Sequence, residues 1–102
     1  MKSKIIWRYT LSPPKTGTIV TIEMPVGAEP LSVGMAHGEA NVWAEVPSLD
    51  AGVSMFEKRM LMVVPTGHPF ELPDRAVFVG TFDVVENMID FIFHVYDLGG
   101  SS

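Results

Sequence analysis

The feature of this sequence that most limits its fold is a repeated alternation of apolar and polar residues. The alternation has a period of two and runs through residues 4–10, 19–24, 31–35 and 41–46. Successive side chains of a β-strand point to opposite faces of a sheet, so this period is typical of strands with one buried face. Proline and glycine separate the stretches and interrupt both helices and β-ladders. The sequence therefore predicts short strands joined by turns.

The second half of the chain continues this pattern with less regular connections. Residues 57–64 are apolar on both faces, and residues 76–83 and 89–97 predict two further strands. Residues 47–55 and the proline-rich residues 65–74 are expected to be irregular connections. These segments predict an all-β fold, a small antiparallel β-sandwich or barrel of about seven short strands. Because sequence neighbours usually pair, we expect mostly hairpins.

Length, charge and composition exclude several classes of protein. A chain of 102 residues is typical of one domain, which we expect at residues 1–98, followed by a flexible tail at residues 99–102. The net charge of -5 is opposite in sign to that of a nonspecific nucleic-acid binder. With no cysteine, the chain has no disulfide framework. Its longest apolar run is far shorter than the ~20 residues of a membrane span. We expect a cytoplasmic protein that binds no nucleic acid and no membrane.

One turn is predicted in detail. His37 and Gly38 lie between two alternating stretches. A two-residue hairpin turn often requires a positive φ at both central residues, which glycine adopts easily and histidine tolerates better than most residues. We therefore expect a hairpin with an exposed His37.

Seven short segments resemble a known family when they are taken together. They are Ile6–Tyr9, Thr21–Ala28, Leu31–Val33, Val42–Ala44, Thr66–Pro69, Val79–Phe82 and Phe93–Tyr96. In this order they resemble a family of small proteins of unknown function that tailed bacteriophages and bacteria encode. The resemblance covers most of residues 4–96 and departs from the family pattern in the loops at residues 13–14 and 47–56. It implies a phage or prophage context and assigns no catalytic residue.

Motifs for catalysis or metal binding are weak. His37, His68 and His94 lie on three different predicted elements and lack the spacing of a zinc site. The serines lack the Gly-x-Ser-x-Gly context of an activated nucleophile, and the sequence contains no glycine-rich phosphate loop. We expect no enzyme activity, no catalytic residue, no metal and no cofactor.

Two features predict contact with a ligand or partner. The loop residues Thr66, Gly67 and His68 can present backbone N–H groups to an anion, although they can equally form a rigid connection between two strands. Trp43 lies between polar neighbours on its strand face, which is typical of an interface anchor or of the lid of a second small core.

The predicted buried residues and a second apolar set define the expected core. Residues expected to be mostly buried are Trp7, Val20, Ile22, Val33, Val42, Val79, Phe91, Phe93 and Val95. Residues expected on the opposite faces are Ile6, Ile19, Trp43, Leu61, Val63, Ile92 and Tyr96. The second set either covers another small core or forms a contact surface, and we expect a homo-oligomer.

These observations predict a small non-enzymatic binding protein. In the phage context that the resemblance implies, its partner is expected to be a host protein or a small signalling molecule in the infected bacterial cell, for example in counter-defence. The alternative is a virion component, such as a capsid-decorating or tail accessory protein.

Overall fold

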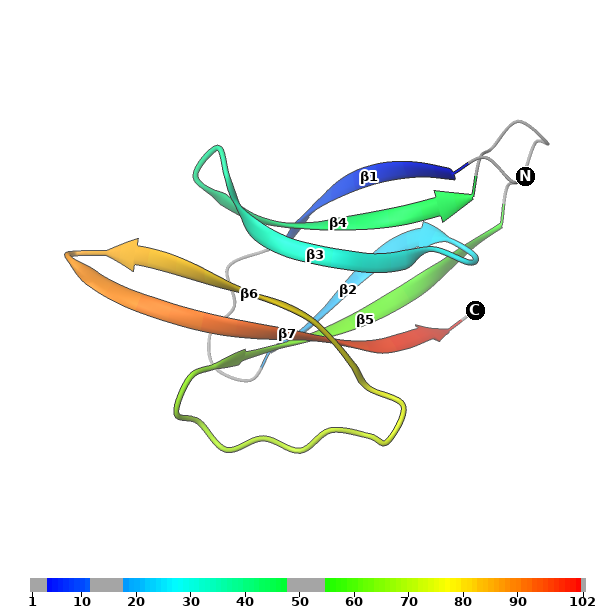
Figure 1. The fold of residues 1–102 in the computed structure, drawn as a ribbon. Coiled ribbons are helices and arrows are strands. Elements are labelled where there is room, and N and C mark those ends of the chain that lie inside the picture. Colours follow the sequence, from blue (N-terminus) through cyan, green and yellow to red (C-terminus); the bar gives the residue numbers. More distant parts are fainter. Residues whose placement is uncertain (1–3, 12–17, 48–54, 102) are drawn as a thin grey trace.

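The computed structural model describes residues 4–11, 18–47 and 55–101, which form two antiparallel sheets (Figure 1). The three-stranded sheet has the order β1-β4-β3, and the four-stranded sheet has the order β2-β5-β7-β6. We call them sheet A and sheet B. The strands are β1 (Lys4–Leu11), β2 (Thr18–Pro25), β3 (Glu29–Ala36), β4 (Glu39–Pro47), β5 (Phe56–Pro65), β6 (Val77–Glu86) and β7 (Ile89–Ser101). The predicted all-β fold of seven strands is confirmed.

The strand pairing differs from the expected series of hairpins. The neighbours β3 and β4, and β6 and β7, pair as hairpins, but β1 pairs with β4, β2 with β5 and β5 with β7. The chain changes sheet between β1 and β2, between β2 and β3, and between β4 and β5. These changes place two apolar sheet faces opposite each other, which separate hairpins in one layer do not achieve.

The inner faces of the two sheets bury one core. Its fully buried members include Val42, Ala44 and Val46 from sheet A and Leu61, Val63 and Val95 from sheet B. The edge strands β3 and β6 come closest at Gly80, where a Cβ atom would lie 3.0 Å from Cγ2 of Val33. Only glycine fits between the two strands here without a shift of its neighbour.

The structure corrects the predicted face of Leu61 and Val63. Both were expected opposite the core, and both are fully buried in it. Strand β5 is apolar on both faces, so the alternation of its residues does not indicate which face meets sheet A. The face is set by the pairing of β5 between β2 and β7.

Phe91 was expected to be buried but is 44% exposed. It lies on the same strand face as the buried Phe93, so the predicted alternation holds. However, β5 ends at Pro65, opposite Phe93, and β7 extends beyond that point. Of the other predicted core residues, Val42, Phe93 and Val95 are buried, and Trp7, Val20, Ile22, Val33 and Val79 are partly buried.

Tyr96, from the second apolar set, joins a partly exposed aromatic cluster on the outer face of sheet B. The ring of Tyr96 lies 5.6 Å from that of Phe70 and 5.4 Å from that of Phe78, measured between ring centroids. Phe70 belongs to the connection between β5 and β6, which is therefore held against the sheet at this point. Ile6, Ile19 and Ile92 remain exposed.

Strand β7 continues where the sequence predicts a flexible tail. Gly99 and Gly100 pair with β5. Arg59 donates to both oxygens of the Asp97 carboxylate, at 2.9 and 2.6 Å, and the N–H of Gly99 donates to the same group. The hydrogen bonds from Arg59 to the Asp97 carboxylate raise the pKa of Arg59 above its usual value. Together with the bond from Gly99, they hold the strand end in sheet B. Ser102 and the predicted loop residues 13–14 and 48–54 lie outside the described residues.

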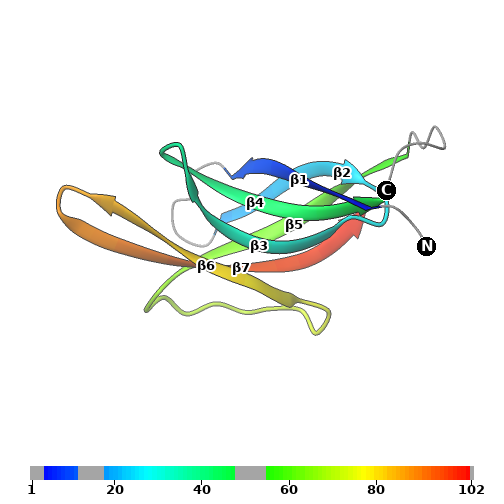
Figure 2. The same ribbon diagram turned by 45° about the horizontal axis from the view of Figure 1, so that its top comes forward.

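The paired ends of β6 and β7 project beyond the other strands, as Figures 1 and 2 both show. We call residues 83–92 the arm. The molecule measures 47 × 31 × 20 Å, and its radius of gyration is 14.3 Å. A compact chain of this length has a radius of gyration of about 12.8 Å. The described residues include no helix of the length and apolarity that a bilayer span requires.

The two neighbouring phenylalanines of β7 test where the core ends. Phe93→Ala should lower the free energy of unfolding by about 3–5 kcal/mol, because it removes a buried ring that stacks on Phe82. Phe91→Ala, on the same face but half exposed, should lower it by about 1–2 kcal/mol. Urea denaturation of both variants measures the difference. Equal losses would place Phe91 in the core and contradict the described end of the sandwich.

The hydroxyl of Tyr9 predicts an alkaline loss of stability. It is buried without a hydrogen-bond partner among the described residues, and burial raises the pKa of Tyr9 above its ordinary value. The unfolded phenol titrates with a pKa of about 10. The free energy by which the raised pKa of Tyr9 favours the folded state is therefore fully present below about pH 10, and it is lost as pH rises through the folded pKa. Tyr9→Phe should raise the free energy of unfolding by about 1 kcal/mol at neutral pH and reduce the alkaline loss. Urea denaturation of the wild type and the variant at neutral pH and above about pH 10 checks this. Identical pH profiles of the two proteins would contradict it.

Candidate functional site

The arm ends in a two-residue turn formed by Asn87 and Met88. Their φ angles are +53° and +66°, close to those of His37 and Gly38 in the β3–β4 hairpin, where the predicted turn is confirmed. The left-handed conformation costs a side-chain-bearing residue such as methionine roughly 1–2 kcal/mol. The side chain of Met88 is also 98% exposed, so packing against the rest of the chain does not offset this cost.

Large apolar side chains are exposed along the whole arm. The exposed fractions are 65% for Val85, 98% for Met88, 57% for Ile89, 44% for Phe91 and 42% for Ile92. Single exposed apolar residues are normal on protein surfaces, but here five of them lie on one projecting hairpin, on both of its faces and at its tip, and such a concentration is typical of an interaction site. The arm is therefore the strongest candidate for a contact surface among the described residues.

The two faces of the arm differ in charge. On the face that continues the core, Val84 lies opposite Phe91 and Glu86 lies opposite Ile89. On the outer face, Val85 lies opposite Asp90 and Asp83 lies opposite Ile92. The outer face thus alternates carboxylates and branched apolar side chains over two neighbouring strands.

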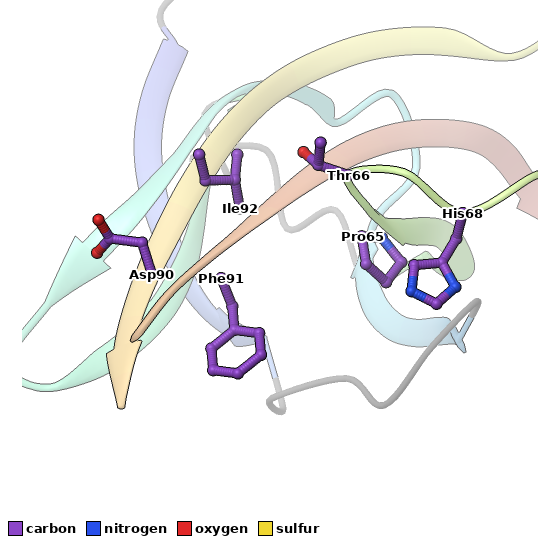
Figure 3. Close-up of a pocket in the computed structure, with 6 residues that line it drawn as sticks. All are labelled: Pro65, Thr66, His68, Asp90, Phe91 and Ile92. Carbon is purple, nitrogen blue, oxygen red and sulfur yellow. The ribbon is translucent and has the colours of Figure 1, made fainter. Parts of the chain in front are cut away.

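A cavity of about 400 Å³ lies at the base of the arm (Figure 3). It is lined by Pro65, Thr66, His68, Asp90, Phe91 and Ile92. The structure thus brings two of the predicted contact residues, Thr66 and His68, together with three residues of the arm. Figure 3 shows Phe91 and Ile92 leaving β7 on opposite sides, with Pro65 at the end of β5 and His68 after the turn that follows it.

His94 joins this turn to the sheet. Its Nε2 lies 2.8 Å from Oγ1 of Thr66, and its Nδ1 lies 3.0 Å from Oγ1 of Thr81. A hydroxyl beside an imidazole is the first half of a nucleophilic dyad, but the second ring nitrogen here meets a hydroxyl and not the carboxylate that would stabilise an imidazolium. We interpret these bonds as a brace that fixes the turn against β6 and β7.

The remaining predicted contact residues have different places. Gly67 lies in the same turn and has a φ of +89°. Trp43 lies in β4, the central strand of sheet A, on the face opposite the core, and its Cζ3 would be 3.5 Å from a Cβ at Gly34. Trp43 is half-buried and does not line the cavity. Its role as an interface anchor stays a prediction.

Electrostatics separate the arm from the rest of the molecule. Within the described ranges, the ion pairs are Lys4–Glu45, Arg59–Glu57 and Arg59–Asp97, and none includes a carboxylate of the arm. No group of three His, Asp or Glu side chains in the described part of the chain is placed to hold a metal ion.

A family profile described as a domain of unknown function (DUF7352) matches residues 2–101, almost the whole chain. The chain belongs to the DUF7352 family. No curated protein and no solved structure matches it.

In this DUF7352 chain, sequence reasoning missed the arm residues Val85 and Met88 as parts of a site. One signal was present, because a turn of asparagine and methionine lacks the glycine that a two-residue hairpin favours. A second signal was the absence of lysine and arginine after Arg75. Neither signal shows that β6 and β7 extend past sheet A, since that depends on the lengths of strands distant in sequence.

The two hairpin turns of the DUF7352 chain allow a matched pair of substitutions. Met88→Gly should raise the free energy of unfolding by about 0.5–1 kcal/mol, because glycine removes the left-handed strain at some cost in chain entropy. Gly38→Ala, at the equivalent turn position with a φ of +77°, should lower it by about 1 kcal/mol. Thermal unfolding measures both changes. A destabilised Met88→Gly variant would mean that the methionine side chain packs against the chain.

Proposed function

We propose that this chain is a non-enzymatic binding protein that holds a partner protein through its arm. The observation that carries the proposal is the exposure of Val85, Met88, Ile89 and Phe91 on a hairpin that projects from the sandwich. Exposing apolar side chains at a strained turn is unfavourable for the free chain, and such features cluster at sites where another molecule supplies the missing contacts.

The available surface supports a protein partner. Exposed apolar side chains extend along the arm from Phe91 and Ile92 at its base to Met88 at its tip, and a protein partner can cover a surface of this length. The cavity at the base of the arm has the size of a small-ligand site. A small signalling molecule is less well supported, because Val85, Met88 and Ile89 do not line that cavity and would stay exposed beside such a ligand.

The setting of this activity comes from the sequence resemblance. The resemblance to proteins of tailed phages and bacteria supports the proposal that the chain acts in the cytoplasm of an infected bacterial cell, where the proposed partner is a host protein whose capture blunts defence. A role in the virion, as a capsid-decorating or tail accessory protein, uses the same arm to contact a neighbouring subunit. Detection of the chain in purified virions would favour this second role. Self-association stays a separate prediction.

The experiment uses two exposed apolar residues of sheet B as a matched pair. A host protein that copurifies with the wild-type chain is identified, purified and titrated by calorimetry. Met88→Asn should weaken its binding at least about tenfold, because it removes a central apolar contact. Asparagine tolerates a positive φ, so the turn should survive.

Ile19→Asn is the control. Ile19 lies on β2 and is 49% exposed, so the substitution removes a similar apolar surface away from the arm. Binding within about twofold of wild type is expected. Equal losses in the two variants, or a partner whose affinity does not depend on Met88, would overturn the proposed function.

A further inference from the structure

The net charge of the chain is concentrated near its end. Residues 76–102 contain four acidic residues and no lysine or arginine, so they carry -4 of the net charge of -5. The first 75 residues contain eight acidic and seven basic residues and carry -1. Of the four late carboxylates, Asp97 is paired with Arg59, which leaves Asp83, Glu86 and Asp90 on the arm.

The outer face of the arm combines this charge with apolar surface. Asp83 and Asp90 are diagonal neighbours on adjacent strands, because Asp83 pairs with Ile92 and Asp90 pairs with Val85. Diagonal neighbours in an antiparallel pair lie about 7–8 Å apart, which is within the Debye length of ~8 Å at physiological salt. The two exposed carboxylates therefore repel each other, and a cation placed between them lowers the energy of both.

We propose that the partner meets the outer face of the arm with a basic and apolar surface. Lysine or arginine side chains of the partner approach Asp83 and Asp90, and apolar side chains pack on Val85 and Ile92. This inference rests on the proposed function and specifies the chemistry of its partner. Complementary charge speeds the encounter and selects the partner, while the apolar residues provide the area that is removed from water.

The same charge argues against three other occupants of the arm. A second copy would bring its own Asp83 and Asp90 to a face that already holds two like charges, which costs free energy. The anionic phosphates of nucleic acids are repelled for the same reason. The cytoplasmic surface of a membrane is also anionic and attracts basic segments, so an acidic arm does not favour it.

The test uses a short synthetic peptide in which arginine alternates with valine, and the same peptide with uncharged citrulline in place of arginine. Amide chemical shifts of the full chain are followed by NMR during titration. The arginine peptide should shift residues 83–85 and 90–92 and bind about five- to tenfold more tightly than the citrulline peptide. Its affinity should fall with added salt.

Two double variants, each of which removes two negative charges, complete the experiment. Asp83→Asn with Asp90→Asn should remove most of the preference for arginine, while Glu39→Gln with Glu71→Gln, at exposed sites outside the arm, should keep it. Equal binding of both peptides, or equal effects of both double variants, would overturn the inference. Self-association through the arm, or binding to anionic vesicles that the Asp83 and Asp90 variant strengthens, would also overturn it. A partner that depends on Met88 but not on these carboxylates would leave the proposed function intact.

Discussion

The packing of one sheet on the other determines most of this structure, and it ends at a defined row. Phe82 and Phe93 are the last buried pair of β6 and β7, with their rings stacked at a centroid distance of 5.3 Å. Up to this row, inner-face residues of sheet B such as Leu61, Val63 and Val95 are buried in the core. Beyond it, the two strands continue with the same alternation and project past the described strands of sheet A, although Val84 still packs against the core. The exposed arm is thus a consequence of unequal strand lengths in two packed layers.

The turn of the arm departs from the local rules that the other two-residue hairpin turn follows. In the hairpin of His37 and Gly38, the turn residues suit their φ angles and the side chain at the tip is polar. At Asn87 and Met88 the chain combines a strained backbone with a fully exposed apolar side chain. Positions where the fold contradicts the local preferences of the residues are expected at functional sites and rarely elsewhere. The arm therefore differs from an ordinary surface hairpin in its backbone, its side chains and its charge together.

The sequence predicted what depends on neighbouring residues and missed what depends on distant ones. The seven strands and the first hairpin turn follow from local alternation and from the φ preferences of glycine and histidine. The pairing of β1 with β4, the burial of Leu61 and the exposure of Phe91 depend on which sheet each strand joins and where that sheet ends. Two of the six residues that line the cavity, Thr66 and His68, were singled out from the sequence, because loop composition is visible there. Three others, Asp90, Phe91 and Ile92, come from β7, which only the fold brings to that loop.

The position of β6 at the border of sheet B has a consequence for how the protein behaves at high concentration. An edge strand such as β6 presents unpaired backbone groups that can pair with strands from other molecules. Charged side chains such as Asp83 and Glu86 oppose this growth, and they act as gatekeepers for the apolar stretch between them. Asp83, which we propose to contact a basic partner, therefore also opposes edge-to-edge assembly of copies of this protein.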